Sequence, residues 1–366
     1  MRRRFLGYTF IMNIAIDARF YGTGHTGLGR YTTNVLKYLP NHLQGQALKV
    51  LLRDREYHNF PSGKNIEKIH AEIPHYSLAE QIELPNLLKK IDADLLYTLH
   101  FNAPILSSIP KIVTVHDLIK THFVGSQTTT RAPWLYQLKR YGYNQVIQKT
   151  LMQACDIIVP TNTVKNDILA NFTSVKPEKI RPIPEAPDDI FRHPKLLSLD
   201  LPKEFVLFVG NAYPHKNLEL LIRSMRPLSP LPLVIVAKQS TFLKRILAKY
   251  EGSNIIVMSD LTDQELVTVY ARANVLVTPS LMEGYGLVGL EAMMVGTPVV
   301  ASNIAVYREV YGDKVSYFDL TNEASLTKTI TQTMASKRRL PLNYPRTWNQ
   351  VSESIAEVIN ARCLSL

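Results

Sequence analysis

The stretch that decides the fold is Pro279–Ser302, which reads PSLMEGYGLVGLEAMMVGTPVVAS. The apolar run Asn274–Thr278 before it predicts a buried strand, and Leu287–Met294 predicts a helix that stops near the following Gly-Thr-Pro. The glycine loop between them would present N–H groups and the positive end of a helix dipole, which suit an anionic diphosphate. Glu283 and Glu291 add carboxylates, which accept hydrogen bonds from hydroxyl groups. The stretch therefore predicts a site for a phosphorylated sugar or a nucleotide.

The composition is that of a soluble globular chain with two domains. At 366 residues the chain is too long for one ordinary core, and it is 46% hydrophobic and 20% charged. A net charge of +11 fits anionic ligands, an acidic membrane surface or nucleic acid, and equally a solubilising surface. Because the sequence has no RNA- or DNA-binding signature, we expect no nucleic-acid partner. The two cysteines, Cys155 and Cys363, lack metal-ligand spacing, which indicates no metal site and a reducing cytoplasm.

The amino terminus, MRRRFLGYTFIMNIAI, resembles a signal peptide in its basic start and apolar middle. It continues into Asp17 and Arg19 without a small-residue cleavage site, so we interpret residues 1–11 as a tail before the first strand. No apolar run approaches the roughly 20 residues that span a bilayer. We therefore expect a cytoplasmic protein that is soluble or peripheral on the inner face of the membrane.

Both halves of the chain alternate apolar runs with helical patterns, which argues for βα units and mainly parallel sheets. The expected strands are Asn13–Asp17, Ala47–Arg53, Asp94–His100, Lys111–His116, Asp156–Pro160, Glu204–Gly210, Leu233–Ala237, Asn254–Met258, Asn274–Thr278, Pro298–Ala301 and Val315–Phe318. The expected helices are Leu28–Leu39, Leu78–Ile91, Trp134–Gln153, Val164–Phe172, Asn217–Met225, Thr241–Tyr250, Asp263–Ala271, Leu287–Met294, Ile304–Tyr311, Glu323–Ala335 and Trp348–Ala361.

Five prolines within Lys179–Pro202 indicate a linker, so we place the domain boundary near residue 195. The predicted organisation is a tail (1–11), an amino-terminal domain (12–195), a carboxy-terminal domain (196–345) and a final segment (346–366). The helix in that last segment is amphipathic and is available to brace the two domains.

The early segment Gly22-x-Gly24-x-x-Gly27 matches the dinucleotide-binding fingerprint. A Rossmann strand should enter its glycines directly, yet Asp17–Tyr21 intervenes, and no acidic residue follows at the expected spacing. We therefore disfavour a nicotinamide or flavin cofactor. A glycine loop whose backbone approaches a phosphate or substrate is the preferred interpretation, with a plain turn as the alternative.

Two more motifs follow predicted strands, where catalysis concentrates in open α/β sheets. His116 and Asp117 end one strand, and histidine suits proton handling or sugar contacts near neutral pH. The alternative is a structural histidine beside an aspartate that caps a turn. Lys216 lies before a helix with Asn217 as its N-cap, where it adds positive charge to an anion site. The alternative for Lys216 is a solvated lysine in a turn.

The segment Arg131–Lys149 mixes basic and aromatic residues in a helical pattern. It could contact a membrane headgroup layer or an acceptor, or it could be a solvated helix with an aromatic core face. Any membrane contact would therefore be peripheral.

Together these motifs resemble the retaining nucleotide-sugar glycosyltransferases of family 4, which have the GT-B architecture. Glu283 and Glu291 match the two glutamates of the family's E-x7-E block. PHKN around Lys216, the early loop GHTGLGRY, VTVHDL around His116 and the closing helix also look like that family. The resemblance covers essentially residues 12–362. It implies two Rossmann-like, doubly wound domains that face each other across a cleft, with the last helix bracing them.

The resemblance also implies roles. The carboxy-terminal domain would hold a GDP- or UDP-hexose and the amino-terminal domain the acceptor. Glu291 would bind the ribose hydroxyls, Glu283 the transferred sugar and Lys216 the diphosphate, while His116 and Asp117 would lie at the sugar. The other donor contacts would be Gly27, Leu28, Asn211, Gly284, Tyr285, Gly286, Leu287 and Val288. Because the family is generally metal-independent, we expect no cofactor, and protein cations would stabilise the leaving group.

Two positions depart from the family pattern. Asn211 stands where many members carry an arginine, so Arg19, Arg30 or another cation would have to replace it. Pro184–Asp189 (PEAPDD) replaces a PNGVD segment. The leading interpretation is transfer of a mannose- or glucose-type hexose to a glycan, lipid-linked or polysaccharide precursor acceptor, with GDP-mannose mildly preferred over UDP-sugars. The alternatives are a sugar-nucleotide epimerase or hydrolase of the same fold, and a sugar-nucleotide-binding subunit without turnover.

Overall fold

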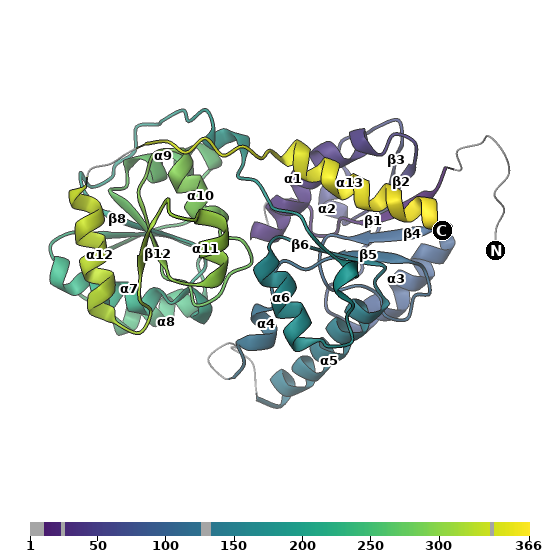
Figure 1. Cartoon of the computed structure of the whole chain (residues 1–366), viewed down its shortest axis with the longest axis horizontal. Helices are drawn as coiled ribbons and strands as arrows, with labels where there is room; N and C mark the ends of the chain where they lie inside the picture. The colour runs from purple at the N-terminus through teal and green to yellow at the C-terminus, as the bar shows by residue number, and fades with distance from the viewer. Residues whose placement is uncertain (1–10, 23–25, 126–132, 337–339) are drawn as a thin grey trace.

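The computed structural model describes residues 11–22, 26–125, 133–336 and 340–366. It consists of two α/β domains that lie side by side, and the chain crosses between them twice (Figure 1). Most of the tail expected at residues 1–11 lies outside the described residues. The predicted fold, two Rossmann-like domains with a last helix that returns to the first domain, is confirmed.

Each domain is built on one sheet of parallel strands. The first sheet has the order β3 (Ile66–His70), β2 (Ala47–Leu52), β1 (Asn13–Asp17), β4 (Leu95–Thr98), β5 (Lys111–Thr114), β6 (Asp156–Val159) and β7 (Ile180–Pro182). The second sheet has the order β10 (Ile255–Met258), β9 (Leu233–Val236), β8 (Val206–Val209), β11 (Val275–Thr278), β12 (Val299–Ser302) and β13 (Ser316–Phe318).

Helices connect the strands of both sheets. In the first domain they are α1 (Thr26–His42), α2 (Asp54–Tyr57), α3 (Leu78–Lys90), α4 (Ile119–His122), α5 (Pro133–Gln153) and α6 (Asn162–Asn171). In the second they are α7 (Leu218–Met225), α8 (Thr241–Lys249), α9 (Asp263–Arg272), α10 (Leu287–Met294), α11 (Ala305–Tyr311) and α12 (Glu323–Ala335), and α13 (Trp348–Ser365) ends the chain.

The strand order of both sheets reverses at one point. In the first sheet this point lies between β1 and β4, and in the second between β8 and β11. Ligands of open α/β sheets bind outside the carboxyl ends of the strands at such a point. The loops after β8 and β11 are residues 210–217 and 279–286, so the topology brings the PHKN motif and the Glu283 loop to one place.

The sequence predicted the central strands because they are buried on both faces. β4, β5, β6, β11 and β12 are buried along their whole length, and such strands are continuous apolar runs. Two edge strands were missed. β3 has two consecutive charged residues between its isoleucines and no buried residue, and β7 falls within the segment predicted to be linker. Proline is tolerated at the edge position of β7, so the prediction that the linker begins at residue 179 is wrong.

The carboxy-terminal helix α13 completes the amino-terminal domain, where it lies beside α1 (Figure 1). Trp348, Val351, Ile355 and Ile359 are buried in the same core as α1, and burial of each such side chain contributes about 1.5–3 kcal/mol. A capping box between Thr347 and Gln350 starts the helix. The predicted amphipathic stripe is therefore the face that fastens the end of the chain to the first domain.

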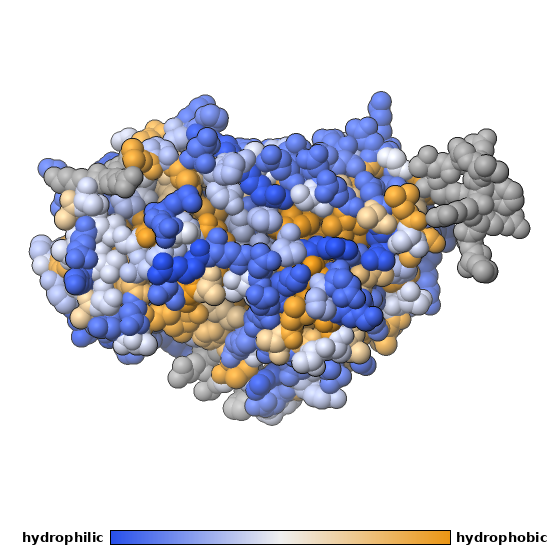
Figure 2. All heavy atoms as spheres, viewed as in Figure 1, coloured by the Kyte–Doolittle hydropathy of each residue, from blue (hydrophilic) through white to orange (hydrophobic). Residues whose placement is uncertain are grey.

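The surface is mixed in character. Hydrophilic side chains cover most of the face in Figure 2, with hydrophobic patches among them on both domains. Within the described residues, no helix has both the length and the apolar character needed to cross a membrane.

Candidate active site

A cleft of about 1940 Å³ is lined by both domains. Its carboxy-terminal half includes Asn211, Lys216, Lys238, Asp260, Thr262, Asp263, Glu283, Leu287, Val288 and Glu291. Its amino-terminal half includes Gly27, Arg30, Tyr76, Glu80, Phe101, Asn102, Asp117 and Lys120, together with side chains of α5. The predicted cleft between the domains is therefore present, and it contains both glutamates of the opening stretch.

The turn from β11 into α10 depends on glycine. Gly286 has a φ of 94°, in the left-handed region, and it is the residue before the first turn of α10. A Cβ atom there would lie 2.5 Å from the hydroxyl oxygen of Tyr311. Glycine thus allows the close turn that directs the start of α10 at the cleft, where Leu287 and Val288 lie in the lining. The amides of these first helical residues have no carbonyl one turn earlier within the helix, so this end suits an anion.

Glu283 and Lys216 form an ion pair across the two loops. Lys216 Nζ lies 2.5 Å from Glu283 Oε1, and the Ser280 hydroxyl donates to the same oxygen at 2.7 Å. The Tyr307 hydroxyl adds a third hydrogen bond of 3.2 Å. Burial alone would raise the pKa of Glu283, but the charge of Lys216 and the hydrogen bonds from Lys216 and Ser280 hold it below its ordinary value. The carboxylate is therefore ionised and fixed.

The helical start that was expected after Lys216 differs in detail. Lys216 ends a short 3-10 turn, Pro214–Lys216, and α7 begins at Leu218. Asn217 stands at the N-cap position, but its φ is 53° and its side chain makes no capping hydrogen bond, so the prediction of a capping side chain is wrong. The left-handed residue turns the chain sharply instead.

Glu291 lies one turn into α10 and is buried, with 7% of its surface exposed. It accepts a 2.8 Å hydrogen bond from the Tyr270 hydroxyl. Burial raises its pKa to about 7, against the opposing effects of the nearby Arg30 charge and the Tyr270 hydrogen bond. A buried carboxylate with unused acceptor capacity would gain from hydroxyl donors in the cleft.

The amino-terminal wall contains the histidine motif in an unexpected arrangement. His116 Nε2 donates to the Leu99 carbonyl at 2.9 Å, and Nδ1 lies 3.3 Å from Glu185 Oε1. Both ring nitrogens thus have protein partners, and His116 is not in the cleft lining. Burial lowers its pKa, but Glu185 outweighs that effect and raises it. Asp117 does line the cleft, and its Oδ1 accepts from the Ile119 amide at 2.9 Å, which caps a turn.

The other predicted donor residues divide into two groups. Gly27, Asn211, Leu287 and Val288 lie in the cleft lining. The residues outside it are Leu28, Gly284, Tyr285 and Gly286. Gly284 lies where the domains touch, because a Cβ atom there would come within 2.0 Å of the His116 carbonyl oxygen. The Tyr285 hydroxyl donates to the Glu185 carbonyl at 3.0 Å, so it also joins the domains.

Arg19 and Arg30, the two cations considered as substitutes at Asn211, have different surroundings. Arg19 is 1% exposed and pairs with Asp17 and Glu80, each at 2.6 Å, which excludes it from a donor site. Arg30 lines the cleft, where it pairs with Asp263 and, at 3.2 Å, with Asp188. Asp188 belongs to the PEAPDD segment, so that departure from the family pattern supplies a partner for a cleft cation.

Sequence reasoning missed the tyrosines that hold the glutamates. Tyr270 and Tyr307 come from α9 and α11, and nothing in their spacing indicates that they contact Glu291 and Glu283. One potential metal-ligand cluster occurs among the described residues, made of Asp54, His70 and Glu72. All three are exposed, and none lines the cleft.

Comparisons with known proteins agree with this geometry. Residues 189–350 match the family model described as "Glycosyl transferases group 1", and residues 25–189 match "Glycosyltransferase Family 4". The O-antigen chain mannosyltransferase RfbU of Salmonella typhimurium is 26% identical over 258 residues, which cover 68% of this chain and 67% of that protein. The serotype-specific mannosyltransferase WbdA of Escherichia coli is 28% identical over 299 residues, 75% of this chain but only 36% of WbdA. The chain thus corresponds to about a third of WbdA.

Solved structures share the architecture. Sucrose-phosphate synthase from Thermosynechococcus elongatus has a TM-score of 0.63 at 19% identity, covering 97% of both chains. WaaG, a glycosyltransferase involved in lipopolysaccharide biosynthesis, has a TM-score of 0.66 at 15% identity, covering 94% of this chain and 95% of WaaG. At such identities the likeness shows the fold alone. The two family models together span residues 25–350, and the chain belongs to the family-4 glycosyltransferases of the GT-B fold.

Proposed function

We propose that this enzyme is a retaining hexosyltransferase that moves a mannose- or glucose-type sugar from a nucleotide diphosphate sugar to a glycan, lipid-linked or polysaccharide precursor acceptor. The observation that carries the proposal is the arrangement of Glu283, Lys216 and Glu291. An ionised carboxylate paired with a lysine, a helix start and a buried second carboxylate meet in one cleft. These groups match, in order, a sugar, a diphosphate and a ribose.

In the proposed reaction the bond between the anomeric carbon and the diphosphate opens with oxocarbenium character. Negative charge then develops on the departing phosphate, where Lys216 and the amides at the start of α10 would stabilise it. The acceptor hydroxyl attacks from the same face and gives its proton to the departing phosphate. Because protein cations and a helix end supply the charge stabilisation, we propose that no metal and no further cofactor take part.

The donor base is proposed to be guanine, with uracil as the alternative. Asp260 lines the carboxy-terminal half of the cleft just after β10, and its φ of 55° is uncommon for a residue other than glycine. A carboxylate only accepts hydrogen bonds, and the guanine edge offers adjacent N–H donors, whereas uracil places a carbonyl on each side of its single N–H. The names of RfbU and WbdA, both mannosyltransferases, also support GDP-mannose.

We propose that the enzyme works in the cytoplasm, in peripheral contact with the inner face of the membrane. The support lies on α5, where Trp134, Leu138 and Tyr141 are 71%, 62% and 65% exposed, with Lys139 and Arg140 between them. Exposed aromatic and apolar side chains interleaved with basic ones suit an anionic headgroup layer. Most of the tail that precedes Ile11 and the residues just before α5 lie outside the described residues.

A donor panel tests the proposal. GDP-mannose, GDP-glucose, UDP-glucose and UDP-galactose are compared by thermal shift, because a bound ligand raises the melting temperature according to its affinity. The products are then analysed by NMR with an octyl mannoside acceptor, with and without EDTA. We expect an α-linked glycoside and equal rates in both conditions. An epimer or free hexose indicates the epimerase or hydrolase alternative, binding without conversion indicates a binding subunit, and a β-linked product would rule out retention.

A further inference from the structure

Lys120 lies on α4 in the amino-terminal half of the cleft, over two aromatic rings. Its Nζ atom is 4.1 Å from the ring centroid of Tyr76 and 5.6 Å from that of Phe101. Such contacts stabilise an ammonium group without neutralising it. Among the residues that the structure describes, no carboxylate forms an ion pair with Lys120. The structure therefore presents to the cleft an ammonium group that the two rings hold in place, although burial lowers its pKa and the Asp117 charge only partly opposes that effect.

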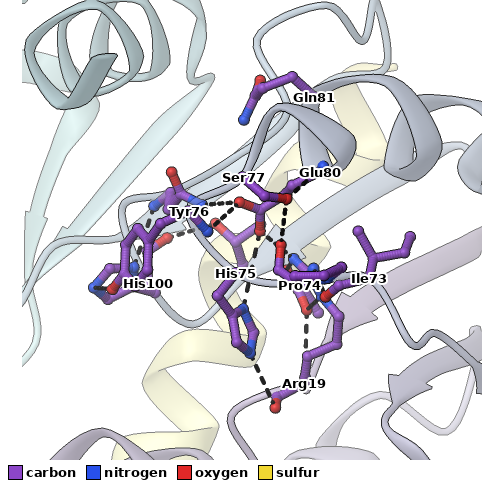
Figure 3. A network of polar contacts seen from close by, with 12 residues as sticks. Arg19, Ile73, Pro74, His75, Tyr76, Ser77, Glu80, Gln81 and His100 are labelled. Carbon is purple, nitrogen blue, oxygen red and sulfur yellow. Dashed lines mark hydrogen bonds and ion pairs between the residues drawn. The ribbon is translucent and has the colours of Figure 1, made fainter. Parts of the chain in front are cut away.

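The ring beneath this charge is held at a conformational cost. Tyr76 has a φ of 56°, and a bulky side chain in the left-handed region is a true outlier. Its amide donates to Glu80 Oε2 at 2.9 Å, and its hydroxyl is hydrogen-bonded to His100 Nε2 at 3.2 Å (Figure 3). Backbone strain persists only where the surroundings fix it, and it is concentrated at ligand sites.

Those surroundings are a buried ion-pair network at the base of α3 (Figure 3). Glu80 Oε1 accepts from Arg19 at 2.6 Å, and Glu80 Oε2 accepts from the Asn102 side chain as well as from the Tyr76 amide. Asn102 is the neighbour of Phe101 in the chain. The buried Glu80 carboxylate therefore holds the backbone at Tyr76 and at Asn102, next to Phe101. Glu80 and Asn102 line this half of the cleft, but the network is not a binding site for the sugar donor.

We propose that Lys120, supported by Tyr76 and Phe101, binds a phosphate group of the acceptor. A lysine ammonium is a compact charge that suits phosphate, and partial removal from water strengthens its attraction for an anion. The identification of this half of the cleft as the acceptor side rests on the function proposed above. The phosphate could belong to a lipid carrier or to a free sugar phosphate, because both present the same anion.

The surroundings place this phosphate beside the transferred sugar. Asp117, three residues before Lys120, is near enough to Glu283 for that charge to raise its pKa, an effect added to the larger one of burial. Asp117 is also close to the Glu283 loop, because a Cβ atom on Gly284 would lie 3.4 Å from the Asp117 Cβ atom. The same half of the cleft also has apolar lining residues, among them Ile105, Leu106 and Leu138. A polar group, a cation and apolar side chains in one half of the cleft fit a saccharide joined through phosphate to a lipid chain.

The test measures binding of geranyl diphosphate, inorganic diphosphate and geraniol by calorimetry, with GDP and UDP present to fill the donor half. Lys120→Met removes the charge and keeps an unbranched side chain over the rings, and Lys120→Arg restores the charge. Lys89→Met, an exposed lysine on α3 outside the cleft lining, is the matched control. We expect Lys120→Met to weaken diphosphate binding about tenfold or more, Lys120→Arg to recover most of it, and the control to bind as the wild type does.

The three probes distinguish the sources of the phosphate. Tighter binding of geranyl diphosphate than of either inorganic diphosphate or geraniol supports a lipid-linked acceptor, and equal Lys120-dependent binding of the two diphosphates supports a free sugar phosphate. Equal binding to the wild type and Lys120→Met, or no diphosphate binding to the wild type, overturns the proposal. Failure of the proposed function would appear separately, as the absence of a thermal shift with any nucleotide sugar, and would leave the comparison between the wild type and Lys120→Met intact.

Discussion

Replacing Glu291 by glutamine should stabilise the free protein and remove donor binding. The Glu291 side chain is buried, and burial raises its pKa from 4.5 to about 7, although Arg30 and the hydrogen bond from Tyr270 act in the opposite direction. Glutamine keeps an oxygen for Tyr270 but carries no charge that burial could penalise. The variant therefore separates the free-energy cost of burying the carboxylate from its contribution to donor binding.

The size of the effect follows from the pKa of Glu291. A folded-state pKa above the unfolded value means that the folded protein binds the proton more tightly. The stabilisation from this group is complete below about pH 4.5 and is lost as the pH rises through about 7. Since one pKa unit corresponds to about 1.4 kcal/mol, the wild type loses roughly 3 kcal/mol over this range. Glu291→Gln has no such loss, so its advantage should grow from near zero to roughly 3 kcal/mol.

Urea denaturation of both proteins across this pH range measures the difference, and groups common to both cancel. Thermal shift with GDP-mannose and UDP-glucose measures donor binding, which should tighten in the wild type as the pH rises through about 7, because an ionised carboxylate accepts more strongly from the proposed ribose hydroxyls than a protonated one. In the variant we expect no shift. A stability difference that does not change with pH would refute the buried, proton-binding carboxylate, and wild-type donor binding by the variant would refute its contact with the ribose.

Three further substitutions test other parts of the site. Lys216→Met should lower the turnover rate about 10²–10³-fold with an unchanged circular dichroism spectrum, because one preorganised charge at the leaving group is lost and Glu283 is left unpaired; near-wild-type turnover would remove the assignment. Gly286→Ala should cost about 1–3 kcal/mol in urea, since φ is 94° and the new methyl group would meet the Tyr311 hydroxyl; a neutral effect would show that the loop adapts. Glu309→Ala should cost about 1 kcal/mol, because this carboxylate accepts from two amides at the start of α6 across the domain contact, and an unchanged melting temperature would contradict that capping role.

The alternation of strands and helices could be predicted because burial on both faces makes central strands apolar throughout. β11 and α10 are examples, and their predicted ends differ from the observed ones by at most one residue. β3 could not be found in the same way, since an edge strand may carry charge on each exposed position, as in IEKIH. A continuous apolar pattern therefore predicts strands that are buried, and it does not detect exposed edge strands.

The site was predictable where chemistry and spacing lie within one segment, as for Glu283 and Glu291. It was not predictable where side chains from distant elements compete for a local partner. Ser77 and Glu80 have the spacing of a capping box, and the Ser77 hydroxyl does accept from the Glu80 amide at 3.0 Å. The Glu80 carboxylate instead pairs with Arg19. An unpaired buried guanidinium would cost more free energy than an unmade hydrogen bond at the start of a helix, where water can take the place of the carboxylate. Thr262 and Glu265 have the same spacing, and there the complete capping box forms.

Asn211 stands where many family members carry an arginine. Neither Arg19 nor Arg30 supplies the missing positive charge at the proposed diphosphate site. Arg19 is held by two buried carboxylates, so no change of side-chain conformation brings its charge to the cleft without leaving them unpaired. Arg30 does face the cleft, but its charge acts on Glu291, and this places it at the ribose end of the proposed donor.

We therefore propose that the positive charge at the diphosphate comes from Lys216 and the start of α10, with Lys238 as the other lysine in this half of the cleft lining. A helix end supplies about half an elementary charge, so Lys216 carries most of the stabilisation there. Its ion pair with Glu283 keeps the ammonium in place in the free enzyme, at the cost of partly neutralising it. In the proposed reaction, contact between the transferred sugar and Glu283 would make the same ammonium available to the leaving phosphate. If its charge is released as the donor binds, one lysine would serve where many family members carry an arginine and a lysine.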